Sequence, residues 1–321
     1  MRIFKHSPLD AWLVAYSVAH GAALLGFALI WDSSAPGARL AMAVGLAALT
    51  TYNIIIVSHL FTHKPWFEAR AANAAVSILN SITIGQSVQA YRLSHVRNHH
   101  RYNNDRAGAD GETKDTSSTF SGGRDGEHLP AWRYAFIGAA QTLFGATVEL
   151  IRLDRLWGLG PNEAGLRENL AAADPARRRE LRQLRLDRIA RAGAMVGLLL
   201  ISWPFVLFCL FPALYAAFAL VNVQNYFEHF GARPEERRAD SVSHYGRLYN
   251  RLTFNDGHHQ EHHLRPNAHW SRLPEVRREL SCVRDGARVV SPVPAILGFL
   301  DRSRTRLDRA PVPPAEGEAH G

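Results

Sequence analysis

The sequence predicts an all-α integral membrane protein, in which four transmembrane helices form two hairpins and carry a cytoplasmic, histidine-rich helical cap. Three observations lead to this prediction. Long stretches contain no charged residue, although 21% of the whole chain is charged. Sixteen histidines occur, and most of them fall into four short clusters. Arginines concentrate in a separate polar stretch at 152–191.

The first two spans are predicted at 11–31 and 40–58, which are both free of charge. A helix needs about 20 apolar residues to cross a bilayer, and both runs approach that length. The first run is too long for the apolar region of a signal peptide. The connection "DSSAPGA" lacks Lys and Arg, whereas Arg2 and Lys5 precede the first span. The positive-inside rule therefore places both ends of this hairpin in the cytoplasm.

Three segments follow before the next spans. Residues 71–91 are uncharged but rich in Asn, Ser, Thr and Gln, which predicts an interfacial or re-entrant helix. Residues 101–130 are rich in Gly, Asp, Asn and Ser and are expected to form a loop. The uncharged run at 134–148 is short for a span, so we expect it to lie at the membrane surface.

The uncharged run at 192–227 predicts the second hairpin. As one helix it would measure about 54 Å, against roughly 30 Å of hydrocarbon. Two spans at 188–204 and 208–227 fit instead, with a turn near Trp203–Pro204. Residues 1–300 are then one membrane-embedded domain, and the Pro- and charge-rich residues 301–321 are expected to be a disordered tail.

The histidine clusters are expected to lie together at the cytoplasmic ends of the spans. They read "HLFTH" at 59–63, "HVRNHH" at 95–100, "NYFEH" at 225–229 and "NDGHHQEHHLRP" at 255–266. Positions four apart share one face of a helix, so each cluster should present its imidazoles in one direction. The four clusters contain ten histidines, and the nine that are expected to converge exceed the needs of one ion. Two metal ions are implied, each with four or five nitrogen ligands and room for another molecule.

Imidazole ligands leave the metal open among Zn, Cu, Ni and Fe. A closed structural zinc site needs only four ligands, normally including cysteine. The two cysteines, Cys209 and Cys282, stand far apart in the sequence. Two open, histidine-rich metal sites beside an apolar helix bundle favour iron-based activation of O2.

The clusters resemble the histidine boxes of the membrane fatty acid desaturase and alkane hydroxylase superfamily, whose members bind two non-haem irons. "HLFTHK", "HVRNHH" and "NYFEHFG" are similar to boxes of alkane monooxygenases, although Phe230 stands where Tyr is usual. The flanking "HHRYNN" and "EHHLRP" resemble acyl desaturases instead. The resemblance covers residues 58–280.

The resemblance implies that the metal ligands themselves are the catalytic residues, with none separate from them. It implies that Asn225 contacts iron through water, and that His258 is either a tenth ligand or a hydrogen-bond donor behind a ligand. Glu228 and Glu261 either accept hydrogen bonds from imidazoles or are exposed to solvent. The implied iron ligands are His59, His63, His95, His99, His100, His229, His259, His262 and His263.

By resemblance, the activity is O2-dependent oxidation of unactivated C–H bonds in a fatty acyl or alkyl chain. Desaturation is favoured by the acyl desaturase flanks and by the four spans. Terminal hydroxylation, as in a monooxygenase, and oxidative decarboxylation of a fatty acid to a 1-alkene stay open. A zinc-dependent membrane hydrolase fits nine nitrogen ligands less well. A non-catalytic metal sensor or transporter would need polar ligands within the bilayer, whereas these clusters are expected at its cytoplasmic edge.

The partners are inferred from charge and from missing motifs. The net charge of +8 is mostly due to arginine, which is concentrated in 152–191, where acidic residues interleave and no aromatic platform occurs. A cytoplasmic loop beside the membrane explains this pattern better than nucleic-acid binding. The sequence has no CxxC pair, flavin-binding glycine loop or haem motif. Electrons are therefore expected from a separate ferredoxin, rubredoxin or b-type cytochrome with its reductase.

Overall fold

Helices make up almost all of the regular structure. The computed structural model describes residues 2–108, 110–123, 126–152, 175–281 and 288–303. Within these ranges the strands are limited to one short parallel pair, β1 (Val242–Ser243) and β2 (Val289–Val290). The same ranges contain four helices that are long and apolar enough to cross a membrane. The prediction of a mostly helical chain with four candidate spans is confirmed.

The first two candidate spans lie close to their predicted positions. The first is α1 (Asp10–Ile30). The second runs continuously through α2 (Pro36–Tyr52), the π-helix η1 (Asn53–Ser58) and α3 (His59–His63). It begins at a proline in the first helical turn, where the missing N–H costs nothing. Because the helix continues through α3, it carries the first histidine cluster.

The polar segment after α3 is helical, as predicted, but it is broken into two parts. The first part is α4 (Arg70–Thr83). The second is α5 (Val88–Arg92), which continues into the π-helix η2 (Leu93–His99) and the short α6 (His100–Tyr102). Gly85 lies at the break with φ +70°, a conformation that residues with a side chain rarely adopt. The expected loop comes after α6.

The third candidate span differs from the sequence prediction. The π-helix η3 (Arg133–Ile137) and α7 (Gly138–Ile151) form a helix of 19 residues that is apolar enough to cross a membrane. Its short uncharged run had placed it at the membrane surface. That run ends before Glu149, but the Glu149 carboxylate is ion-paired with Arg188 and Arg191 of the neighbouring helix. The helix can therefore extend past Glu149 in an apolar environment, and its length no longer indicates a position at the membrane surface.

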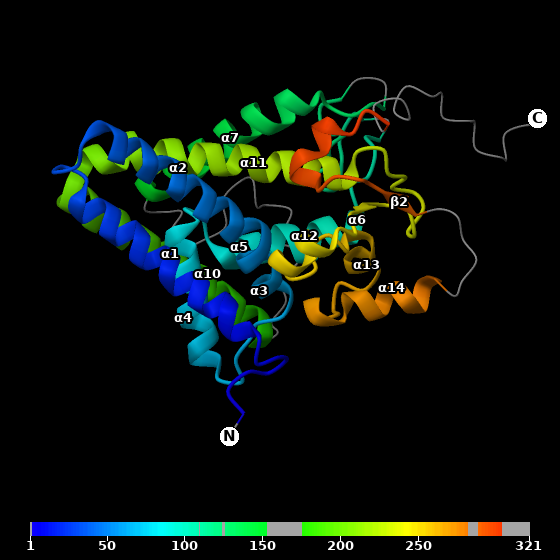
Figure 1. Cartoon of the computed structure of the whole chain (residues 1–321), viewed down its shortest axis with the longest axis horizontal. Helices are drawn as coiled ribbons and strands as arrows, with labels where there is room; N and C mark the ends of the chain where they lie inside the picture. Colours follow the sequence, from blue (N-terminus) through cyan, green and yellow to red (C-terminus); the bar gives the residue numbers. More distant parts are fainter. Residues whose placement is uncertain (1, 109, 124–125, 153–174, 282–287, 304–321) are drawn as a thin grey trace, which may run out of the picture.

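The fourth candidate span extends over 52 residues, Arg178–His229, and is bent. It comprises α10 (Pro175–Phe205), η5 (Val206–Leu210) and α11 (Phe211–His229). The backbone leaves the helical conformation at Ser202, two residues before Pro204, which is next to the predicted turn. The Ser202 hydroxyl donates to Asp32 Oδ1 at 3.0 Å, which links the bend to the turn after α1. Figure 1 shows both turns at the same end of the molecule.

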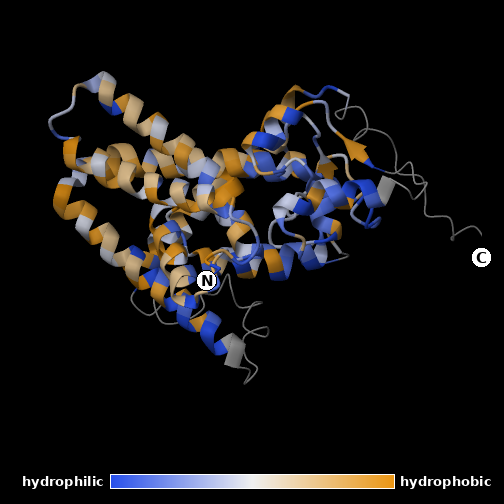
Figure 2. Cartoon of the chain, turned by 60° about the horizontal axis from the view of Figure 1, so that its bottom comes forward, coloured by the Kyte–Doolittle hydropathy of each residue, from blue (hydrophilic) through white to orange (hydrophobic). Residues whose placement is uncertain are grey.

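The C-terminal third folds at the opposite end, where α12, α13 and α14 lie (Figure 1). Figure 2 shows apolar residues concentrated on the long helices and polar residues around this end. The chain is ordered slightly further than predicted, because Asp301 is buried and accepts a hydrogen bond from Ser291 Oγ at 3.2 Å. Residues 304–321, most of the expected tail, lie outside the described residues. The elements are α12 (Arg247–Leu252), α13 (His259–Leu264), η6 (Trp270–Arg272), α14 (Leu273–Ser281) and η7 (Ala295–Leu300).

Candidate metal centre

All nine histidines implied as ligands come together in two groups. Within each group the candidate ligand nitrogens lie within 4.8 Å of one another. The side chains come from α3, η2, α6, α11 and α13, so the fold unites segments that are far apart in sequence. The five-histidine group consists of His59, His63, His95, His100 and His262, and the four-histidine group consists of His99, His229, His259 and His263.

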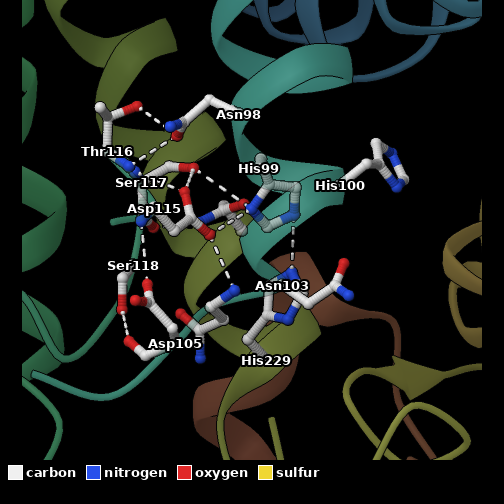
Figure 3. A network of polar contacts seen from close by, with 12 residues as sticks. Asn98, His99, His100, Asn103, Asp105, Asp115, Thr116, Ser117, Ser118 and His229 are labelled. Carbon is white, nitrogen blue, oxygen red and sulfur yellow. Dashed lines mark hydrogen bonds and ion pairs between the residues drawn. The ribbon is translucent and has the colours of Figure 1, made fainter. Parts of the chain in front are cut away.

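A π-helix divides the "HVRNHH" cluster between the two groups. In η2 the hydrogen bonds run from i to i+5, so residues five apart lie on one face. His95 and His100, which are five apart, belong to the five-histidine group, while His99 belongs to the other. In Figure 3, His99 is directed toward His229, whereas His100 points away from them. The expectation that each cluster faces one direction is wrong here, because it assumed α-helical periodicity.

The last cluster is also divided, and a tight turn places it. α13 contributes His259 and His263 to the four-histidine group and His262 to the five-histidine group. Before α13, the backbone adopts positive φ at Phe254 (52°) and Asn255 (64°). Such strain in residues with side chains is concentrated at functional sites. At Gly257, a Cβ would lie 2.2 Å from the His244 carbonyl oxygen, so only glycine allows this approach.

Backbone carbonyls determine which nitrogen of three histidines faces the groups. The Nδ1 atoms of His59, His63 and His229 each lie 3.0 Å from a carbonyl oxygen. A carbonyl can only accept a hydrogen bond, so each of these Nδ1 atoms carries the proton. The lone pair is then on Nε2, which faces the other imidazoles. This arrangement orients a ring for metal binding.

His99 is oriented by a buried carboxylate instead. Its Nδ1 donates to Asp115 Oδ2 at 2.7 Å, and the Ser117 hydroxyl lies 3.3 Å from the same nitrogen (Figure 3). Burial raises the pKa of Asp115, but His99 and the hydrogen bonds from Ser117 outweigh it and leave that pKa below its usual value. Asp115 is therefore an ionised acceptor that would strengthen His99 in the role of a metal ligand.

The distances between imidazoles fit metal coordination. The Nε2 atoms of His59 and His262 are 3.1 Å apart, as are those of His99 and His229. Imidazole binds metals at about 2.0–2.1 Å, which separates neighbouring ligands by about 3 Å. Other buried Nε2 atoms have no hydrogen-bond partner, which is costly for a polar group unless something else binds it. These are the Nε2 atoms of His63, His259 and His263.

The protonation of the cluster also suits metal binding. Burial, followed by neighbouring imidazoles, lowers the pKa of His95, His100, His262 and His263 well below the usual value for histidine. These rings are therefore neutral at pH 7. A neutral imidazole has the free lone pair that a metal requires.

The other predicted site residues lie around the two groups. Among the described residues, Asn225 forms no hydrogen bond with a histidine; its Nδ2 donates to the Tyr134 hydroxyl at 2.6 Å. Glu228 Oε1 lies 3.5 Å from Nδ1 of His259, but the two atoms form no hydrogen bond, so its role as an acceptor stays a prediction. Its buried side chain excludes the alternative of solvent exposure.

His258 and Glu261 form a pair of their own. His258 belongs to neither group, and its Nδ1 lies 3.6 Å from Glu261 Oε2. Glu261 is fully buried, so its solvent exposure is excluded too. It accepts hydrogen bonds from Tyr245 and Ser243 rather than from a histidine of either group.

Three aspartates that support the histidines were not predicted from the sequence. Asp115 accepts from His99, and the Asp240 carbonyl accepts from His229. Asp256 Oδ1 lies 3.6 Å from Nδ1 of His59. All three occupy polar segments outside the long helices and resemble ordinary loop carboxylates in sequence. Only Asp256, in "NDGHH", lies close in sequence to clustered histidines, which weakly indicated a place at the site.

A cavity of about 180 Å³ adjoins both groups, and we call it the metal-side cavity. Its lining includes His59 and His95 from one group and His259 from the other. Ile54 and Phe218, from the long helices, supply apolar walls. A substrate that enters between these helices would therefore reach both groups.

Fold and site together define a mostly helical protein with candidate membrane spans and two histidine groups suited to metal ions. The family model described as fatty acid desaturase matches residues 34–288, so the chain belongs to the fatty acid desaturase family. This confirms the resemblance and implies an oxidoreductase of lipid metabolism. The chain is also similar to a sphingolipid delta(4)-desaturase of Candida albicans (strain SC5314 / ATCC MYA-2876), with 55% identity over 40 residues. That match spans 12% of this chain and 10% of the relative.

Proposed function

We propose that this protein is an oxygen-dependent, non-haem di-iron oxidase of unactivated C–H bonds in a fatty acyl or alkyl chain, and that it acts as a desaturase. The observation that carries the proposal is the pair of buried histidine groups around one cavity. Membership of the fatty acid desaturase family supports this type of reaction.

The two groups would each hold one iron ion, with five and four imidazole ligands respectively. Bound iron would supply the redox chemistry that activates O2 and removes hydrogen from an alkyl chain. Asn225, at the wall of the metal-side cavity, would complete the four-histidine site through a water molecule. The carbonyl and carboxylate acceptors hold the imidazoles in place, and the buried lining limits access of bulk water to the reacting carbons.

Desaturation removes one hydrogen from each of two neighbouring carbons and reduces O2 to two waters. The balance requires two further electrons and two protons. We propose that a separate ferredoxin, rubredoxin or b-type cytochrome, with its reductase, delivers the electrons. An acidic donor would suit the basic chain, whose net charge is +8.

The candidate spans also suggest a membrane arrangement. We propose that α1 with α2–α3, and α10 with α11, are two membrane hairpins, and that the histidine-bearing end faces the cytoplasm. Arg2 and Lys5 precede α1, and the turn Trp31–Ala35 has no Lys or Arg. This asymmetry supports the orientation.

Hydroxylation and oxidative decarboxylation share their first step with desaturation, the removal of one hydrogen, and differ from it in the later steps. Product analysis therefore tests the proposal. Purified protein should contain about two irons per chain and should require an electron donor, its reductase and O2 for turnover. Deuterated fatty acids should yield a product that has lost two deuteriums from adjacent carbons. A terminal alcohol or an alkene one carbon shorter would contradict desaturation, and full activity with one metal would contradict the di-iron site.

A further inference from the structure

A second, larger cavity of about 620 Å³ adjoins the metal-side cavity. It lies between the loop after α6, the helix formed by η3 and α7, and part of α11. Ser117, Tyr134, Thr142 and Asn222 line both cavities. The two spaces are therefore neighbours that share one wall. We call the larger one the hydroxyl-lined cavity.

The lining of this cavity is suited to an anion. Ser118, Ser121 and Gln141 contribute hydroxyl and amide groups, and no carboxylate is present among the lining residues that the structure describes. Arg133 is the one charged residue of that lining. Its exposed guanidinium makes no hydrogen bond or ion pair with any other residue in the described part of the chain. A free guanidinium beside hydroxyl groups matches a carboxylate, which it can bind through two parallel hydrogen bonds.

The shared wall is only one layer of side chains thick. The Tyr134 hydroxyl donates to the Ser117 carbonyl at 2.7 Å and accepts from Asn225 Nδ2 at 2.6 Å. The hydroxyl of the same Ser117 lies 3.3 Å from Nδ1 of His99. A group bound in the hydroxyl-lined cavity is thus separated from the four-histidine group by Ser117 and Tyr134.

The metal-side cavity differs from the hydroxyl-lined cavity in its lining. It includes Gln86 and Ser94 but is mainly apolar, with Ile54, Phe218 and Val221 among its walls. Methylenes can cover apolar walls without leaving polar groups unpaired, so this cavity suits the alkyl part of a substrate. The hydroxyl-lined cavity suits a polar head instead.

We propose that the hydroxyl-lined cavity binds the carboxylate head of a free fatty acid through Arg133, so that the oxidised C–H bond lies within a few carbons of that head. This inference rests on the proposed function for its reaction, and it leaves the balance of atoms and electrons in desaturation unchanged. It adds a substrate class and a position of attack close to the carboxylate.

Binding is tested on the full chain in detergent, without turnover. Thermal unfolding is followed with palmitate, hexadecane and a short-chain ceramide over a range of concentrations. Palmitate should raise the unfolding temperature most, and Arg133→Gln should weaken its apparent affinity about tenfold, because a charge-assisted pair is lost. Arg251→Gln removes an exposed arginine of α12 outside the cavity and should change nothing. Equal stabilisation by hexadecane, stronger stabilisation by ceramide, or an unaffected Arg133→Gln variant would overturn the proposal.

The position of attack is tested separately in cells that express the protein. Palmitate is deuterated either at carbons 2 to 5 or at carbons 9 and 10. We expect loss of deuterium from the first substrate only, and loss from carbons 9 and 10 would overturn the inference. If neither substrate reacts in the presence of a working donor system, the proposed function fails. The thermal measurements with palmitate then still decide whether the cavity binds a carboxylate.

Discussion

At the residue scale, the hydrogen bond that a histidine donates through Nδ1 leaves the lone pair on Nε2, where a metal could bind. His59, His63 and His229 donate through Nδ1 to carbonyl oxygens, and His99 donates to Asp115. Each contact leaves Nε2 unprotonated and directed into the site. The candidate ligand set is therefore arranged without a metal, which would reduce the ordering cost of metal binding.

Replacing His229 with Ala should abolish turnover and release most of the metal of the four-histidine group. His229 is fully buried, and its Nε2 is 3.1 Å from that of His99. Membrane insertion should be unaffected, because the residue lies at the end of α11. Metal content, turnover and the amount of protein in the membrane fraction are compared with those of His6→Ala, a histidine outside both groups. Retained activity in His229→Ala would contradict the ligand assignment.

Asp115→Asn tests the orientation of His99 without changing the size of the side chain. Loss of a hydrogen bond behind a metal-bound histidine lowers metal affinity about 10- to 100-fold. We expect about half of the bound iron to be lost at a chelator concentration that leaves the wild type loaded. The matched control is Asp110→Asn, an exposed carboxylate in the same loop. Equal iron retention by both variants would show that Asp115 does not support the site.

At the element scale, departures from the α-helix place the histidines. The π-helix η1 ends immediately before His59, and η2 ends at His99. Short π-helical segments are rare and occur mostly at functional sites. The tight turn before α13 acts in the same way, because positive φ at Phe254 and Asn255 turns the chain toward the site.

Gly257→Ala tests the turn that positions α13. The added methyl group would meet the His244 carbonyl oxygen at 2.2 Å and Asn250 Oδ1 at 2.9 Å. Relief of this overlap must move the backbone, at a cost of about 1–3 kcal/mol in the free energy of unfolding. We expect a lower unfolding temperature together with reduced metal content. Gly193→Ala adds the same methyl where nothing lies within 4 Å, and it should lose neither property. Normal metal content in Gly257→Ala would contradict this role of the turn.

At the scale of the whole molecule, apolar helices and polar site lie at opposite ends (Figure 2). Large apolar side chains remain exposed on the helices, among them Leu200 (83%) and Trp12 (68%). A soluble surface rarely carries such side chains over long helices, whereas lipid would cover them. In the proposed membrane arrangement, the histidines would lie at one edge of the bilayer.

Cysteine labelling tests this orientation. Ser33→Cys, in the turn after α1, and Glu236→Cys, beyond α11, both place an exposed thiol outside the helices. In a Cys282→Ser background, a maleimide that cannot cross membranes should label only Ser33→Cys in intact cells. Glu236→Cys should react after permeabilisation. The reverse pattern would place the histidine-bearing end outside the cytoplasm, and labelling of both thiols in intact cells would exclude two membrane hairpins.

Much of the helical architecture could be predicted from the sequence, because a helix that can cross a membrane needs a long run of uncharged, apolar residues. The uncharged runs predicted α1 and α2, and Pro204 predicted the bend found at Ser202. The helix at Arg133–Ile151 was not predicted as a candidate span, because Glu149 ended the uncharged run. Its partners, Arg188 and Arg191, are distant in sequence, so the neutralisation of its charge is visible only in the folded chain.

The sequence by itself determined which nine histidines gather, through motifs that resemble the histidine boxes of the family. Position in a cluster alone did not separate His258 from its neighbours. Only the tertiary structure decided how they divide. His95 and His99 were expected on one face, but the π-helix between them places them in different groups. Asp115, which orients His99, comes from a loop without a sequence signature. Such assignments depend on local helix geometry and on long-range contacts, which spacing along the chain does not contain.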